Sequence, residues 1–298
     1  MNRPLVVFTA LAAASLPITT SAQGCKNLPT GSPEVKLLAF YSAPLAFSTA
    51  AHPVPLKAWQ LQLTLEAATV PSADAAMRAT NCYTASKGES TNLTQVLARP
   101  RVALGLPAGF IAEVGYIPPI TIRDATANLV GLSLAWVVQY GTLAGANVIY
   151  QVRGHTLIGS VEGPITCGRD ALQKTDPLKA CYGDKISNDR YTPNISGLEG
   201  VVSLDAATYA VYLGVGYNSL DPQLQVDFTP LGGIPDRSLV STSRLSRTAI
   251  MAGGTFRLTP RFDVTGQIYA VPDDVSMLRV MLAWRPGSSI PREAVPSR

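Results

Sequence analysis

The chain of 298 residues has a net charge of +4 at pH 7, with 15% charged and 47% hydrophobic residues. Its Lys and Arg residues form no cluster, so the charge does not indicate a nucleic-acid partner. No stretch beyond the N-terminal segment approaches the ~20 consecutive apolar residues that a membrane-spanning helix needs. We therefore expect this apolar chain to bury its surface in sheets.

Residues 1–22 predict a secretory signal peptide. Arg3 gives a basic start, an apolar run extends from Leu5 to Leu16, and Thr20 and Ala22 are small residues at the positions required before a cut. The apolar run is too short for a membrane helix. We therefore expect the chain to be exported.

Residues 23–56 show no alternation and predict a short helix. Ser32 is a candidate N-cap, Pro33 occupies the first helical position, Glu34 lies in the first turn and Pro44 ends the helix. Two placements stay open for this segment, a leader in the periplasm or a plug folded into the interior of the domain that follows.

Ten segments between residues 57 and 285 alternate large apolar residues with small or polar ones, which is typical of strands with two different faces. In Asn128–Tyr140, for example, Leu134 and Trp136 share one face, and Ser133 lies on the other. The other nine segments are Lys57–Thr69, Leu97–Leu106, Gly109–Pro118, Gly145–Ser160, Gly200–Asn218, Pro222–Thr229, Ser246–Leu258, Arg261–Val271 and Val275–Arg285.

Short and long connections alternate between these segments. The short ones are residues 106–109, 141–146, 218–222 and 259–261, and the others are residues 70–96, 119–127, 161–199, 230–245 and the brief 272–274. Tight periplasmic turns and long extracellular loops give this rhythm in outer-membrane barrels. We read Gly200–Asn218 as one long strand, which keeps the strand count even and both barrel ends in the periplasm. A turn at residues 205–208 would instead give eleven strands.

Alternation also fits a soluble β-sandwich or barrel, but two observations favour a membrane barrel. Among seven Lys residues only Lys57 falls in a strand, whereas solvent-facing sheets usually carry Lys and Glu. Aromatic residues of the large faces also gather at the predicted periplasmic strand ends, as in a membrane girdle. These residues are Trp59, Phe110, Tyr140, Tyr217, Phe256, Phe262 and Trp284.

On these features the chain resembles bacterial outer-membrane β-barrel proteins in general, with no single family indicated. The final strand "VSMLRVMLAW" ends in Trp284, similar to the signal read by the barrel-assembly machinery, although a tail of residues 286–298 follows. The resemblance implies an all-β fold: a closed, antiparallel, up-and-down transmembrane barrel over residues 57–285. It also implies lipid and the assembly machinery as partners, and the outer membrane of a Gram-negative bacterium as location.

The small faces of the strands carry the polar side chains that would line the lumen. Opposed Arg and acidic residues in a narrow barrel either fill it with paired groups or select solutes by charge, and both possibilities stay open. The expected lumen-lining residues are Gln60, Gln62, Glu66, Arg99, Arg101, Glu113, Gln151, Arg153, His155, Gln225, Asp227, Arg257, Asp263, Gln267 and Arg279.

Four cysteines in an exported chain predict disulfides, with no metal or other cofactor. Cys167 and Cys181 lie in one long loop and are expected to pair with each other. Cys25 and Cys82 remain as the second pair. Because Cys82 lies in an extracellular loop, this bond requires residues 25–56 to pass through the lumen.

Three functions are compatible with such a barrel. The first is a passive channel or porin-like transporter for small solutes, and the second is a structural or surface-binding barrel that acts through residues 70–96 and 161–199. An outer-membrane hydrolase is the third. The only two histidines, His52 and His155, lack the His-x-Ser arrangement that would activate a nucleophile. We therefore predict a non-enzymatic barrel and place the channel first.

Overall fold

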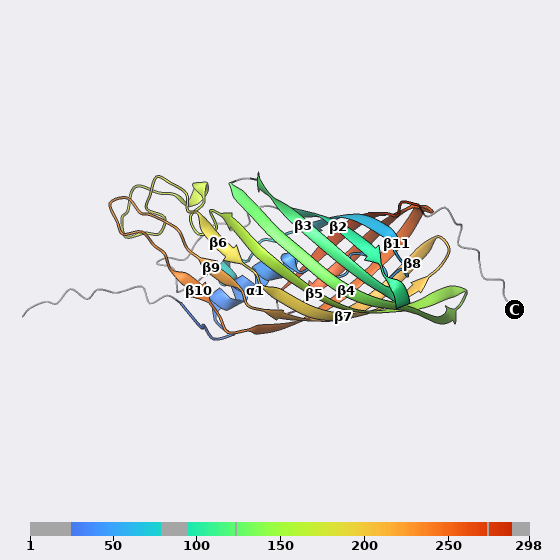
Figure 1. Cartoon of the computed structure of the whole chain (residues 1–298). Coiled ribbons are helices and arrows are strands. Elements are labelled where there is room, and N and C mark those ends of the chain that lie inside the picture. Colours follow the sequence, from blue (N-terminus) through green and yellow to red (C-terminus); the bar gives the residue numbers. More distant parts are fainter. Residues whose placement is uncertain (1–24, 79–94, 123, 273, 288–298) are drawn as a thin grey trace, which may run out of the picture.

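The computed structural model describes residues 25–78, 95–122, 124–272 and 274–287. In this part of the chain ten antiparallel strands form a closed barrel, as predicted (Figure 1). The ring runs in the order β5-β4-β3-β2-β1-β13-β12-β11-β8-β7, and β7 pairs with β5 to close it. The ten strands are β1 (Leu61–Thr69), β2 (Val96–Gly105), β3 (Phe110–Ile122), β4 (Ala125–Leu143), β5 (Ala146–Gly163), β7 (Ile195–Asp205), β8 (Tyr209–Leu220), β11 (Leu245–Thr259), β12 (Phe262–Val271) and β13 (Val275–Trp284).

The remaining described elements are short. β6 (Asp189–Thr192), β9 (Gln223–Gln225) and β10 (Leu239–Ser241) continue the sheet beyond the end of β5. The helices are α1 (Pro33–Leu45), α2 (Ala75–Arg78) and two 3-10 turns, η1 (Pro107–Gly109) and η2 (Arg169–Ala171). No helix in the described part of the chain is long and apolar enough to cross a membrane.

The two ends of the barrel have different connections. Tight turns join the strands at one end, which we call the short-turn end, at residues 106–109, 144–145, 206–208 and 260–261. The opposite, long-loop end holds the longer segments 164–194 and 221–244, which include β6, β9 and β10 (Figure 1). The predicted alternation of short and long connections is therefore present, with three corrections to its details.

The prediction of one long strand over Gly200–Asn218 is wrong. The segment is a hairpin, in which β7 and β8 pair from Asp205↔Ala210 onward and the amide of Ala206 donates to Tyr209 O at 2.9 Å. The turn at residues 205–208, which was the alternative prediction, has no Gly or Pro, and the continuous strand was given more weight because it kept the strand count even. As a consequence, residues 218–222 lie at the long-loop end and do not form a short turn.

The prediction that Pro222–Thr229 is a barrel strand is also wrong. Only Gln223–Gln225 forms a strand there, and it pairs with β6 and β10 outside the ring. The segment alternates because Leu224 packs beside Leu38, and Val226 packs beside a disulfide, in two small apolar clusters. The two errors compensate, so the number of barrel strands is still ten.

The predicted loop at residues 119–127 is mostly strand. β3 extends to Ile122 and β4 begins at Ala125, with a register shift in the pairing between Ile117 and Ile120. Pro118 and Pro119 occupy this shift, and prolines are tolerated in sheets at such irregular positions. The prediction had ended this strand at Pro118.

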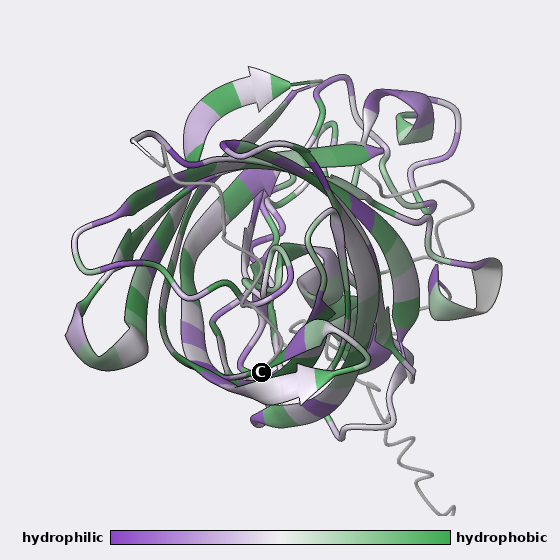
Figure 2. Ribbon diagram, turned by 90° about the vertical axis from the view of Figure 1, so that its right-hand side faces the viewer, coloured by the Kyte–Doolittle hydropathy of each residue, from purple (hydrophilic) through white to green (hydrophobic). Residues whose placement is uncertain are grey.

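The alternating pattern turns the large apolar side chains outward. In β4, Leu134 is 51% exposed and Trp136 is 45% exposed, whereas Ala135 between them is 3% exposed. Figure 2 shows the barrel end-on, with bands of apolar and polar residues alternating along its strands. The large face of residues 128–140 therefore points away from the barrel axis.

Residues 25–60 run through the barrel from the long-loop end to the short-turn end. The amide of Leu28 donates to Ser241 O in β10 at 3.1 Å, and α1 then enters the interior with Ser32 as N-cap (Figure 1). Phe47 is fully buried. The amide of Trp59 finally donates to Gly105 O at the short-turn end, at 2.6 Å. The chain therefore crosses the lumen before β1 begins.

Candidate functional site

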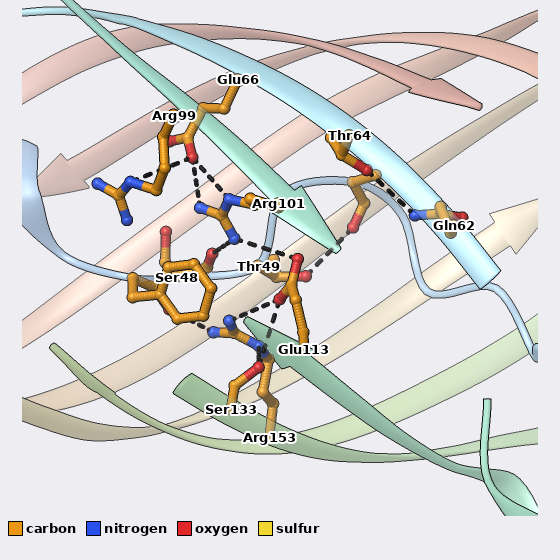
Figure 3. Close-up of polar contacts among 12 residues, drawn as sticks. Ser48, Thr49, Gln62, Thr64, Glu66, Arg99, Arg101, Glu113, Ser133 and Arg153 are labelled. Atoms are coloured by element: carbon orange, nitrogen blue, oxygen red, sulfur yellow. Dashed lines mark hydrogen bonds and ion pairs between the residues drawn. The ribbon is translucent and has the colours of Figure 1, made fainter. Parts of the chain in front are cut away.

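A layer of buried charged side chains fills the middle of the barrel. All of its members except Glu199, which fell in a predicted loop, were predicted to line the lumen, and the four arginines are at most 2% exposed. Figure 3 shows five of them converging from neighbouring strands. The layer consists of Arg99 and Arg101 of β2, Arg153 of β5, Arg279 of β13, Glu66 of β1, Glu113 of β3 and Glu199 of β7.

The charges in this layer are paired at short distances. Arg101 Nη2 lies 2.5 Å from Glu66 Oε2. Arg153 bridges two carboxylates, with Nη2 at 3.0 Å from Glu113 Oε2 and Nη1 at 3.0 Å from Glu199 Oε2. Because a buried charge without a partner costs several kcal/mol, these pairs are what allows the arginines to lie inside the barrel.

Phe47 lies at the centre of the layer. The guanidinium carbons of Arg101, Arg153 and Arg99 lie 4.3, 5.0 and 5.4 Å from its ring centroid, within the range of cation–π attraction. Gly115 and Gly131 face each other across β3 and β4 and leave the space that the ring occupies. A Cβ on either glycine would come within 2.5 Å of a Phe47 ring atom.

The backbone of residues 45–49 is held by luminal side chains. Arg99 Nη2 donates to Leu45 O at 3.0 Å, Arg153 Nη1 to Phe47 O at 2.6 Å and Arg101 Nη1 to Ser48 O at 2.8 Å. The amide of Thr49 donates to Glu199 Oε2 at 2.9 Å. These side chains provide hydrogen-bond partners for backbone groups of residues 45–49 that lie outside any helix or strand. The charged layer and this segment therefore stabilise each other.

The remaining residues predicted for the lumen fall into two groups. Gln225 and Asp227 lie outside the barrel, because their segment is not a barrel strand, and Asp227 pairs there with Arg237. The other group lies on the inward side of the wall or at its short-turn rim: Gln60, Gln62, Gln151, His155, Arg257, Asp263 and Gln267.

The two histidines are surrounded by charged partners. His155 Nε2 lies 3.6 Å from Glu199 Oε1, and His52 Nε2 lies 3.8 Å from Asp205 Oδ1. Each of these carboxylates also pairs with an arginine, Arg153 and Arg257 respectively. The described residues include no group of three or more His, Cys, Asp or Glu side chains placed to hold a metal ion.

The predicted aromatic girdle needs one correction. Tyr217 points outward but lies near the long-loop end of β8, because β8 runs in the opposite direction to the predicted strand. The other six are exposed at or near the short-turn end: Trp59, Phe110, Tyr140, Phe256, Phe262 and Trp284. Trp136, Tyr150 and Tyr209 were not among the predicted girdle residues but are exposed at the same end.

At the long-loop end, the Cys167–Cys181 disulfide is present as predicted, with a Cα–Cα distance of 5.4 Å. Nearby, the buried Asp189 carboxylate accepts hydrogen bonds from the amides of Thr166 and Asp227, at 2.5 and 2.9 Å. Cys82 lies outside the described residues, so the Cys25–Cys82 bond stays a prediction. The bond requires Cys25 to lie at the long-loop end of the barrel. Cys25 does lie there, because its carbonyl accepts a hydrogen bond from the amide of Ser241 in β10.

An apolar cavity of about 500 Å³ lies beside α1 at the long-loop end. The helix contributes one wall, and β2 and β3 contribute another. Ile120 and Ile122 are on the inward side of β3 by their pairing with Ala127 and Ala125, yet they are 63% and 58% exposed. The other apolar side chains of the wall include Leu37, Tyr41, Leu97, Ile117 and Leu224.

The cavity has few polar groups. The Tyr191 hydroxyl donates to Leu38 O at 2.8 Å and lies 2.6 Å from Ser42 Oγ, which ties β6 to α1. Burial raises the pKa of Tyr191 far above its ordinary value, so this group stays neutral. Sequence reasoning missed the cavity because Ile120 and Ile122 fell in a predicted loop. The one signal available in the sequence was that both residues are large and apolar.

No family model matches the sequence, and no curated protein matches it. Similar solved structures are outer-membrane proteins. Ail of Yersinia pestis in complex with sucrose octasulfate is 8% identical and has a TM-score of 0.28, covering 77% of this chain and 99% of that chain. The translocator domain of the autotransporter NalP from Neisseria meningitidis is 10% identical, with a TM-score of 0.29 and coverage of 78% and 90%.

A deletion mutant of TodX, a monoaromatic hydrocarbon channel, is 13% identical and has a TM-score of 0.27, covering 83% of this chain and 70% of that chain. None of these similarities assigns the chain to a family. At these TM-scores the description of the fold rests on the strand pairing of this chain alone.

Proposed function

We propose that this protein is an outer-membrane β-barrel that takes up small apolar compounds and binds them in the cavity beside α1. The observation that carries the proposal is the cavity, about 500 Å³ in volume and almost entirely apolar. This volume lies within the range of sites that bind small molecules, which are typically apolar with a few polar groups. The protein then belongs to the transport class of outer-membrane barrels and is not a hydrolase.

The outward surface supports a membrane location. Leu134, Leu213 and Ile268, on three different strands, are each more than half exposed. Soluble monomers rarely expose a continuous apolar surface of this kind. The aromatic side chains at the short-turn end suit the lipid–water boundary. We infer that this end faces the periplasm of a Gram-negative bacterium, with residues 1–22 as a cleaved signal peptide.

The lumen supports an apolar ligand over the polar solutes of a porin. At the level of Phe47 the interior is filled by residues 45–49 and by arginines that are almost inaccessible. A porin instead keeps a water-filled channel. The charged layer therefore acts as the filling of a narrow lumen, and the cavity above it is where a compound has room to bind.

The test is a titration of the purified protein with 1-aminoanthracene, a small apolar fluorophore. Leu37→Glu places a carboxylate in the cavity wall, and Leu178→Glu places the same group on a loop leucine that is 90% exposed. We expect Leu37→Glu to weaken binding about tenfold, which corresponds to ~1.4 kcal/mol, since the new charge would be poorly solvated. Leu178→Glu should bind like the unsubstituted protein. Absence of saturable binding, or equal affinity in the two variants, would contradict the proposal.

A surface-binding barrel is the second candidate, supported by the ordered segment around the Cys167–Cys181 disulfide. This segment exposes Leu178 almost fully, at 90%, and the adjacent segment 221–244 exposes Ile234, at 89%. Such side chains suit contact with another macromolecule. This function would be supported over the first if the protein binds no apolar probe but adheres to a surface or a macromolecule. Leu178→Glu should then abolish the adhesion.

A further inference from the structure

The pairing between β2 and β3 stops half-way along the barrel wall. The two strands pair from Gly105↔Ile111 to Arg101↔Gly115 and no further. Yet β2 continues to Val96, paired with β1, and β3 continues to Ile122, paired with β4. The ends of β3 and β4 project at the upper left of the barrel in Figure 1. The described wall therefore has a seam between β2 and β3 that is unpaired toward the long-loop end.

Three prolines border this seam. Pro100 lies in β2 next to the last pair, and Pro118 and Pro119 lie in β3 just beyond it. Proline has no amide hydrogen to donate to a neighbouring strand. An open sheet edge in hydrocarbon leaves backbone groups unsatisfied, at several kcal/mol each. The prolines lower the number of unsatisfied donors and so make an interrupted wall less costly.

The apolar cavity extends through this seam. Leu97 faces inward, like Arg99 and Arg101 on the same strand, whereas Ala98 and Pro100 face outward. All three of Leu97, Ala98 and Pro100 line the cavity. A cavity confined to the lumen would be lined by the inward residues of β2 alone. Its lining from both faces means that it opens sideways through the wall.

The register places the opening within the membrane. Gly115, at the end of the β2–β3 pairing, is paired with Gly131, five positions along β4 from the aromatic Trp136. With a rise of 3.3 Å per residue and strands tilted by 35–45°, the seam begins about 13 Å above the level of Trp136. The apolar band of such a barrel is about 25 Å tall, so the seam begins near its middle. The opening therefore faces the leaflet on the long-loop side.

We propose that the seam between β2 and β3 is a lateral opening through which the alkyl chain of an amphiphile dissolved in the outer leaflet enters the cavity. The inference rests on the proposed function and adds to it the ligand class and the route. A single alkyl chain suits an opening that faces lipid tails on one side and apolar side chains on the other. α1 forms the inner wall against which the chain stops.

The opening is tested first without any ligand. A nitroxide label is attached at Ile117→Cys, which faces the cavity, at outward Val114→Cys as the lipid reference, and at Leu178→Cys as the water reference. Oxygen concentrates in lipid, so we expect the label at position 117 to collide with oxygen as often as the label at position 114 does. We also expect the label at position 117 to be protected from a water-soluble nickel chelate. A pattern like that of position 178, or protection from both reagents, would overturn the opening. Ile120→Cys repeats the test if Ile117→Cys does not assemble.

The route is tested with cis-parinaric acid, a fluorescent fatty acid, transferred from vesicles to the protein in nanodiscs. Ala98→Trp obstructs the seam, whereas Val102→Trp lies on the same face of β2 where pairing to β3 is intact. We expect Ala98→Trp to slow association about tenfold and to slow dissociation as well, as an obstructed route requires in both directions. Val102→Trp should change neither rate.

The outcomes separate the two proposals. Binding with unchanged rates in Ala98→Trp would overturn the lateral route and leave the apolar cavity as a binding site. No binding of cis-parinaric acid, together with saturable binding of 1-aminoanthracene, would overturn the alkyl-chain ligand alone. No binding of either probe would overturn the proposed function, and the nitroxide measurement would still decide whether the wall is open.

Discussion

At the scale of single residues, Phe47 and its surroundings explain how the middle of the lumen is filled. Three guanidinium groups lie within 5.4 Å of its ring centroid, and the same arginines donate to the backbone on either side. The two glycines, Gly115 and Gly131, leave the space for the ring. Glycine weakens a strand, so its use at two paired positions indicates a steric requirement at that point.

This arrangement predicts that Gly131→Ala destabilises the protein. The new Cβ would lie 2.5 Å from the Phe47 ring, which the arginines prevent from moving freely. Overpacking of this kind costs about 1–3 kcal/mol. The measurement is the free energy of unfolding in urea, followed by the mobility shift of the folded barrel on gels. Gly200→Ala is the matched control, because its Cβ would meet nothing within 4 Å. Equal stability of the two variants would show that Phe47 is not confined.

The arginines, Glu66 and Glu113 around Phe47 were predicted from the sequence, whereas Phe47 and Glu199 were not. Alternation assigns every second residue of a strand to the lumen, so Arg99, Arg101 and Arg153 followed from their register alone. Residues 46–60 have no period, and no local pattern shows which side chain fills a cavity lined by distant strands. The partner of the charged layer therefore required the three-dimensional structure.

At the scale of the elements, the strand pattern was readable because each barrel strand has two chemically different faces. The prediction was wrong where a segment outside the barrel also has one buried and one exposed face. Residues 222–229 alternate because they lie against the clusters around Leu38 and the disulfide, and β7 and β8 read as one strand because their turn is only three residues long. The extension of β3 past Pro118 and Pro119 was missed because the register shift between Ile117 and Ile120 interrupts the regular alternation.

The outward face of β4 gives a prediction for the membrane assignment. Leu132→Arg lies near the middle of the proposed apolar band, four positions along β4 from Trp136, and Leu143→Arg lies at the short-turn end of the same strand, beyond Tyr140; both leucines are exposed. A charged residue costs about 2–4 kcal/mol at the midplane and about 0–1 kcal/mol near the interface. We expect Leu132→Arg to reduce the yield of folded barrel in lipid vesicles far more than Leu143→Arg. Similar yields would mean that this face does not contact lipid.

At the scale of the whole molecule, the chain crosses the lumen once before the barrel begins. Residue 25 lies at the long-loop end and Trp59 at the short-turn end, so the described N-terminal segment and β1 run in opposite directions. The sequence suggested this path only through the cysteines, since Cys25 and Cys82 can meet only if the segment occupies the lumen. The direction of travel and the apolar cavity beside α1 depend on contacts between distant strands, which no local pattern encodes.

The central claim is that this segment closes the barrel to polar solutes and leaves an apolar cavity at its outer end. Single-channel recording of the purified protein in a planar lipid bilayer tests it most directly. We predict no conductance steps for the unsubstituted protein, and steps in Phe47→Ala, where the buried ring and its cation–π contacts are removed. Regular ion-conducting steps from the unsubstituted protein would contradict the claim, because they require an open, water-filled lumen.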